Sequence, residues 1–150
     1  MRISLFHEND SGYTMIETIA VLMLIGIIAA VAISKSMSAN SYSLVSEAEI
    51  LKTYLRFAQL KAMSDVVPTW GIAVGGSSYT LQKNGATASI NLPGEGSATH
   101  AFPSGVSATE AQTVAFNNWG NPGTTTISIT LTGGSDNATV TVTKNTGFVQ

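Results

Sequence analysis

The 150-residue sequence contains no cysteine, only two histidines and few charged residues. The absence of cysteine excludes disulfide bonds and thiolate metal ligands. Charged residues make up 11% of the chain, and the formal net charge is −2. A basic surface of the kind that binds nucleic acid is therefore not expected. His7 lies near the start of the chain, so His100 is the one histidine in its main part, and we expect it to be a surface or packing residue.

The chain also lacks the short motifs of common catalytic sites. It contains no nucleophile elbow, no paired-histidine zinc motif and no P-loop. Gly94-Glu95-Gly96 is a loop pattern, because no helix pattern follows a strand there. Asp136-Asn137 offers one carboxylate, whereas a calcium site needs several oxygen ligands close together, so we predict a turn at this position. The sequence predicts neither an enzyme nor a cofactor or metal site.

One long stretch, residues 13–34, is apolar and almost free of charge. Glu17 is its only charged residue, and none follows between Thr18 and Ser34. A helix needs about 20 mostly apolar residues to cross the bilayer core. An acidic residue in mid-membrane costs about 2.5–3.5 kcal/mol on insertion. Glu17 is therefore a candidate functional residue; the alternative is that its side chain reaches the membrane interface from near the helix end.

The residues around Glu17 resemble a known signature. Gly12-Tyr13-Thr14, followed by Glu17 and the apolar stretch, is similar to the N-terminal signature of type IV pilins and type II secretion pseudopilins. The resemblance implies that a prepilin peptidase cuts after Gly12 and methylates Tyr13, where phenylalanine is commoner in the family. Residues 1–12 would be the leader peptide, and residues 13–34 would form a transmembrane helix that also packs in the core of a filament.

The resemblance gives Glu17 a physical role in assembly. Cleavage after Gly12 would create an ammonium group on Tyr13, and Glu17 of one subunit could pair with that ammonium on a neighbour. Such a pair is much stronger in a low-dielectric environment than in water. Breaking it leaves a buried charge unpaired, at a cost of about 3–5 kcal/mol. We therefore expect Glu17 to set the register between subunits.

Small residues recur at every fourth position of the apolar stretch. Gly26, Ala30 and Ser34 would lie on one face of a helix. Small residues at this spacing allow close helix packing in membranes, although Gly and Ala are also common in membrane helices for other reasons. Many pilins have a proline where Ser34 stands, and its absence favours a helix that continues through this position.

A different processing event is also compatible with the sequence. Ala30-Val31-Ala32 matches the small-x-small pattern of signal peptidase cleavage after an apolar region. Cleavage there would release a soluble β domain that starts at Ile33. Three features argue against this alternative: the N-terminal segment is not strongly basic, since it has Arg2 but also Glu8 and Asp10, Glu17 is acidic, and the apolar run is long.

Residues 35–66 are predicted to continue the helix as an amphipathic segment. No Pro or Gly interrupts the chain between Ile27 and Val67, and Pro68 ends the helix. Ile50, Tyr54 and Phe57 form a second apolar line that would face either neighbouring subunits or a wide core. The main apolar stripe has helical spacing and consists of Leu44, Ala48, Leu51, Leu55, Ala58 and Ala62.

Residues 67–150 are predicted to form a β-rich globular head. Alternating residues in 125–132 place Ile127, Ile129 and Leu131 toward a core. The fold class is α+β: a long N-terminal helix packed on an antiparallel sheet, which resembles a pilin. The predicted strands are 69–74, 78–82, 89–92, 100–102, 113–116, 125–132, one around Val140 and Val142, and a closing segment at 148–149.

The order of these elements and the C-terminal Thr146-Gly147-Phe148-Val149 look most like minor pilins and pseudopilins of the GspH/FimT type. The resemblance implies a structural subunit of a type II secretion pseudopilus or type IV pilus. It would lie in the bacterial inner membrane as a single-pass protein with a periplasmic head, in a periplasmic or surface filament. Its partners would be prepilin peptidase and other pilin or pseudopilin subunits.

The alternative is a minor pilin whose head binds DNA or a surface. That subgroup often has a basic residue where Phe148 stands, and in the tail only Lys144 is basic, so nucleic acid is a disfavoured partner.

Overall fold

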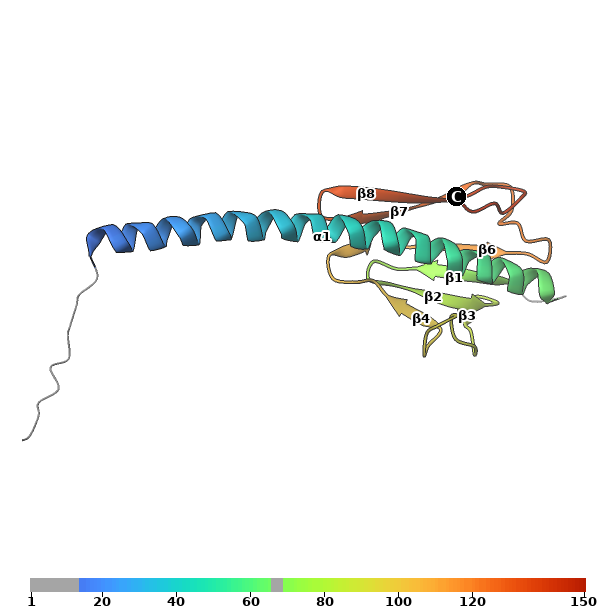
Figure 1. The fold of residues 1–150 in the computed structure, drawn as a ribbon. Coiled ribbons are helices and arrows are strands. Elements are labelled where there is room, and N and C mark those ends of the chain that lie inside the picture. Colours follow the sequence, from blue (N-terminus) through green and yellow to red (C-terminus); the bar gives the residue numbers. More distant parts are fainter. Residues whose placement is uncertain (1–13, 66–68) are drawn as a thin grey trace, which may run out of the picture. The chain divides into compact units, whose positions relative to one another are not determined.

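The structure is a computed structural model that describes residues 14–65 and 69–150; the side chains of residues 33–40 lie outside the description. It divides into two compact units, Met1–Ser36 and Met37–Gln150. Helix α1 (Met15–Ser64) supplies the described part of the first unit and the first element of the second. The second unit, which we call the head, adds two antiparallel sheets, and the predicted α+β class is confirmed (Figure 1).

The first sheet of the head is built around the hairpin of β1 and β2. Its strands are β1 (Trp70–Val74), β2 (Ser78–Lys83), β3 (Ala86–Thr87), β4 (Thr99–Ala101) and β6 (Gln112–Phe116). The path through the sheet is β3-β2-β1-β6, and β4 also pairs with β2. Strand β1 is central because it pairs antiparallel with both β2 and β6.

The second sheet is smaller and follows the order β5-β7-β8. Its strands are β5 (Val106–Ala108), β7 (Ile127–Gly133) and β8 (Asp136–Val142). The β7-β8 hairpin is in register from Ile127 opposite Val142 to Gly133 opposite Asp136. An isolated bridge between Val142 and Val149 brings the predicted closing segment to β8.

The predicted apolar stripe of α1 is the helical side of the core. All six of its residues, from Leu44 to Ala62, are buried. Ile129 and Leu131 of β7 are buried as expected, and Ile127 packs at the edge of the same core. Burial of large aliphatic side chains contributes about 1.5–3 kcal/mol each, so this contact between helix and sheets is a main source of the stability of the head.

The second apolar line of the helix belongs to the core as well. Tyr54 is buried, and Ile50 and Phe57 are partly buried against the core cluster. The second apolar line was predicted to face either neighbouring subunits or a wide core, and the structure supports the wide core. Among the described side chains, the large apolar ones that the head leaves exposed on α1 are Tyr42, Val45, Leu60 and Met63.

Most predicted strands are present, but the segment 89–92 is not one. Instead, the backbone N–H of Leu92 donates to the Ser97 carbonyl, which closes a tight loop. Pro93 cannot donate a ladder hydrogen bond and Gly94 has φ of +80°, so the chain turns directly after Leu92. The short strands β3 and β5 were not predicted. Strand β3 forms because Asn84 and Gly85 both have positive φ, which is the geometry of a tight hairpin turn.

Candidate functional site

The first candidate site lies where α1 begins, in the first compact unit. The backbone N–H of Glu17 donates to the Thr14 carbonyl at 3.0 Å and also faces Thr14 Oγ1 at 3.4 Å. Thr14 directly precedes the helix, and Glu17 is its third residue. Thr-x-x-Glu is the spacing of a capping box. The carboxylate therefore lies in the first helical turn, where the helix dipole favours a negative charge.

The structure places Glu17 as an exposed side chain, with none of its neighbours covering it. Gly12 and Tyr13, the predicted processing residues, lie outside the described residues. The capping role of Thr14 was missed in the sequence analysis, although Thr14 and Glu17 have the required identities and spacing. Capping and pairing with an ammonium group are compatible, because the first uses a backbone N–H bond and the second uses the carboxylate.

The apolar segment after Glu17 is uncovered. One window, Met15–Ala32, has a mean hydropathy of 2.5 and none of it is buried. By length and composition, this helix could cross a membrane, which is compatible with single-pass anchoring. A mostly apolar segment of 18 residues in contact with water would be strongly unfavourable. Burial of this segment in lipid or against other apolar helices would remove that cost.

The predicted packing face on this helix is open. Gly26 and Ala30 are both exposed, and a methyl group added at Gly26 would meet no atom within 4 Å. The side chain of Ser34, the third predicted member, lies outside the described residues. Within the described part of the chain, nothing covers Gly26 and Ala30, so this face is accessible to another helix.

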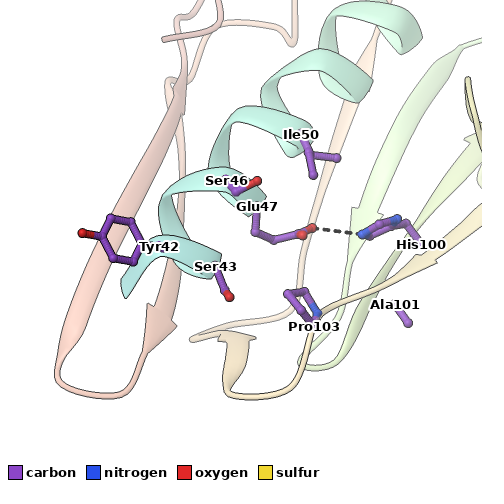
Figure 2. A pocket seen from close by; sticks show the side chains of 8 residues that line it. All are labelled: Tyr42, Ser43, Ser46, Glu47, Ile50, His100, Ala101 and Pro103. Atoms are coloured by element: carbon purple, nitrogen blue, oxygen red, sulfur yellow. Dashed lines mark ion pairs between the residues drawn. The ribbon is translucent and has the colours of Figure 1, made fainter. Parts of the chain in front are cut away.

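A second site lies in the head, where a buried glutamate of α1 meets a histidine of β4. Glu47 is only 3% exposed, and its Oε1 lies 3.3 Å from His100 Nε2. The other ring nitrogen, Nδ1, lies 2.5 Å from Glu95 Oε1 in the loop before β4. Figure 2 shows the Glu47 side chain pointing from the helix toward His100. The imidazole therefore bridges two carboxylates from different parts of the head.

Two tyrosines complete this cluster. The Tyr79 hydroxyl donates to Glu47 Oε1 at 2.9 Å, and its ring stacks on His100 with centroids 5.0 Å apart. The Tyr54 hydroxyl lies 3.3 Å from Glu95 Oε1. Burial, and then the nearby Glu47 charge, raise the pKa of Tyr79. The hydrogen bond from His100 lowers the pKa of Glu95. Both shifts keep the tyrosine neutral and the carboxylate charged near neutral pH.

This cluster links α1 to β4 and to the loop before β4. Both nitrogens of His100 are already directed at carboxylates, and both can donate at once only in the imidazolium form. Among the described residues, no group of three or more His, Asp, Glu or Cys side chains is placed to hold a metal ion. His100 lies between the two carboxylates and stacks on Tyr79. The burial of Glu47 could have been expected from the sequence, because it lies three residues after Leu44 and four before Leu51 on the buried face.

An open depression lies beside the cluster, between α1 and the segment after β4. Its volume is about 470 Å³, and Tyr42, Ile50 and Pro103 form apolar parts of its wall. Glu47 and His100 also line it (Figure 2). The depression thus combines apolar walls with a paired acidic group.

No protein-family model matches the chain, and neither a curated protein nor a solved structure matches it. The functional interpretation therefore depends on the residues and their geometry.

Proposed function

We propose that this protein is a structural subunit, of the minor kind, of a type II secretion pseudopilus or type IV pilus. It is cut after Gly12 by prepilin peptidase and held in the bacterial inner membrane by residues 13–34, with its head in the periplasm. It then assembles into a filament through that helix. The observation that carries the proposal is the uncovered apolar helix that starts directly behind the Gly12-Tyr13-Thr14 signature.

The position of Glu17 supports this proposal. An exposed carboxylate at the first turn of an apolar helix is close in sequence to the ammonium group that cleavage would create on Tyr13. When apolar helices pack together, an acidic group at this position needs a cationic partner. The new N-terminus of a neighbouring subunit would supply that partner and fix the axial register of the two helices.

The head supports an assembly role over an enzymatic one. Its buried polar cluster connects α1 to β4 and the preceding loop, and stiffens the face of the head at that place. A rigid head on an apolar helix is suited to repeated contacts with other subunits. The DNA-binding alternative gains nothing from the described head, because its surface lysines and arginines are few.

The proposal is tested by mass spectrometry of the protein's N-terminus in the membrane fraction and in sheared surface filaments. We expect a chain that starts at N-methylated Tyr13. Abundance in the sheared fraction would identify a surface pilus, whereas retention with the membranes would identify a periplasmic pseudopilus. A chain that starts at Ile33 would overturn the proposal and identify an ordinary exported β domain.

A further inference from the structure

The most exposed large aromatic side chain of the described head is held on a tightly bonded loop. Trp119 is 80% exposed. Asn117 Oδ1 accepts hydrogen bonds from the backbone N–H groups of Trp119 and Asn121, at 3.0 and 3.2 Å. The Asn117 side-chain amide also donates to Asn121 Oδ1. Because the loop is fixed by its own hydrogen bonds, docking of this indole would cost little conformational entropy.

A second exposed aromatic residue lies on the adjoining C-terminal turn. Phe148 is 61% exposed and follows Gly147. Gln59 Nε2 of α1 donates to the carbonyls of both Gly120 and Gly147, which ties the two turns to the helix. A methyl group at Gly147 would lie 1.9 Å from the Gly120 carbonyl, so the two turns are in direct contact. Trp119 and Phe148 therefore belong to one surface, which we call the aromatic end.

The charged side chains of the aromatic end are all basic. The segments 56–64, 117–126 and 143–150 contain Arg56, Lys61 and Lys144 but no Asp or Glu. The Arg56 guanidinium donates to the Val149 carbonyl, beside Phe148. Asp65 follows the helix, but it is paired with Lys83 at 3.3 Å. A partner for this surface should therefore be apolar and acidic.

The other end of the same head has those properties. The depression described above has apolar walls, and its Glu47 belongs to a cluster of two carboxylates and one imidazole. The Ser41 hydroxyl hydrogen-bonds Asp136, which brings the acidic tip of the β7-β8 hairpin to the helix beside Tyr42. Segment 41–50 contains no Lys or Arg, and the nearest, Lys52, is paired with Glu49.

One head cannot join these two surfaces by itself. From Ser41 to Gln59 the helix advances about 27 Å, at about 1.5 Å per residue. We propose that the aromatic end of one head docks in the depression of a second copy of this chain, beside the acidic tip of its β7-β8 hairpin, with Trp119 as the anchor. Trp and Arg are the residues that most often dominate the energy of an interface, and opposite charges favour this orientation.

The contact joins two different surfaces, so it can repeat along a series of copies without closing. This inference rests on the proposed assembly into a filament, and it requires that two copies of this chain be neighbours there. It goes further by naming the second copy as the partner and the two surfaces as the contact.

The absence of cysteine makes the contact testable by cross-linking the full-length protein in its own membranes. One copy carries Asn118→Cys, next to the anchor, and the other carries Ser46→Cys in the depression. A short bis-maleimide should join the two copies, and Trp119→Ala in the first copy should reduce the product about tenfold or more. Thr139→Cys, exposed on β8, replaces Ser46→Cys as the matched control and should give no product.

The charges give a second readout. Lys144→Glu should weaken the cross-link, and this loss should be larger at low ionic strength than at high. Three results would each overturn the proposed contact. The first is a product between two Asn118→Cys copies only, and the second is a product with other proteins only. The third is a yield that Trp119→Ala leaves unchanged. If filaments form without the cross-link, the docking inference fails while the proposed function stands. If the cross-link forms in a chain that starts at Ile33, the docking inference stands while the proposed function fails.

Discussion

The Glu47 carboxylate of α1 and the His100 imidazole of β4 lie 3.3 Å apart, and this contact joins the helix to the edge of the first sheet. Tyr79 supports it from both sides, by donating to Glu47 and by stacking on His100. Removing one member of such a buried pair leaves the other charged and incompletely solvated. The stability of the head should therefore depend on this pair more than on any exposed ion pair of the helix.

His100→Ala should lower the free energy of unfolding by about 2–3 kcal/mol, because Glu47 would keep only the hydrogen bond from Tyr79. Denaturant unfolding of the full chain in detergent, followed by circular dichroism, measures the change. Adding Glu47→Gln to His100→Ala should recover part of the loss, since it removes the unpaired charge. Glu49→Gln on the exposed face is the control and should stay within about 0.5 kcal/mol of the wild type. Equal effects of His100→Ala and the control would contradict the role of the pair.

The head should lose stability in acid. The pKa of Glu95 is lowered mainly by its hydrogen bond with His100, and that of Asp65 by its hydrogen bonds with Trp70 and Lys83. A lowered pKa in the folded state means that the unfolded chain binds protons more readily. The stabilisation is thus complete above the ordinary values of 4.5 and 3.8 and is lost as the pH falls below them.

Glu95→Gln and Asp65→Asn should each flatten this dependence. Each variant should be less stable than the wild type at neutral pH and approach it in acid, because the wild-type carboxyl is then protonated. Thermal unfolding measured between neutral and acidic pH tests this. If the stability of both variants changes with pH in the same way as that of the wild type, other groups control the loss of stability in acid.

Glu17 substitutions separate its two roles. Gln retains the capping-box geometry but has no charge, whereas Asp retains the charge on a shorter side chain. If Glu17 pairs with the neighbouring N-terminus, Glu17→Gln should abolish filament assembly and Glu17→Asp should keep part of it. The measurement is the amount of processed subunit in sheared or cross-linked filaments, with Glu110→Gln on the head as the control. Wild-type assembly by Glu17→Gln would contradict the pairing of this carboxylate with the neighbouring N-terminus.

Gly71 leaves no room for a side chain in the central strand β1. A methyl group there would lie 2.2 Å from the Val114 carbonyl oxygen and 2.9 Å from Ala115 Cα in β6. Gly71→Ala should therefore push the two strands apart and cost about 1–3 kcal/mol of stability. Gly96→Ala is the matched control, because a methyl group at Gly96 would meet nothing within 4 Å. If the two variants have the same unfolding midpoint, the close approach of β1 and β6 is contradicted.

The sequence by itself determined the elements whose signal is local. Helical spacing predicted the buried stripe from Leu44 to Ala62, and alternation predicted Ile129 and Leu131 in the core. The Asn84-Gly85 turn also has a local signal, because only a few residue types accept positive φ. These features depend on residues close to one another in the chain, so they need no knowledge of the fold.

Only the tertiary structure decided which distant residues meet. His100 and Glu47 are more than fifty positions apart, and no local pattern connects them, so the sequence indicated a packing histidine without its partner. Trp119 and Phe148 share a surface because Gln59 binds both of their turns. Short strands such as β5 form because a neighbouring strand supplies hydrogen bonds to them, and their own three residues contain too little pattern to predict this. Local conformational preferences are encoded in short stretches, whereas pairing over long distances is selected by the packing of the whole head.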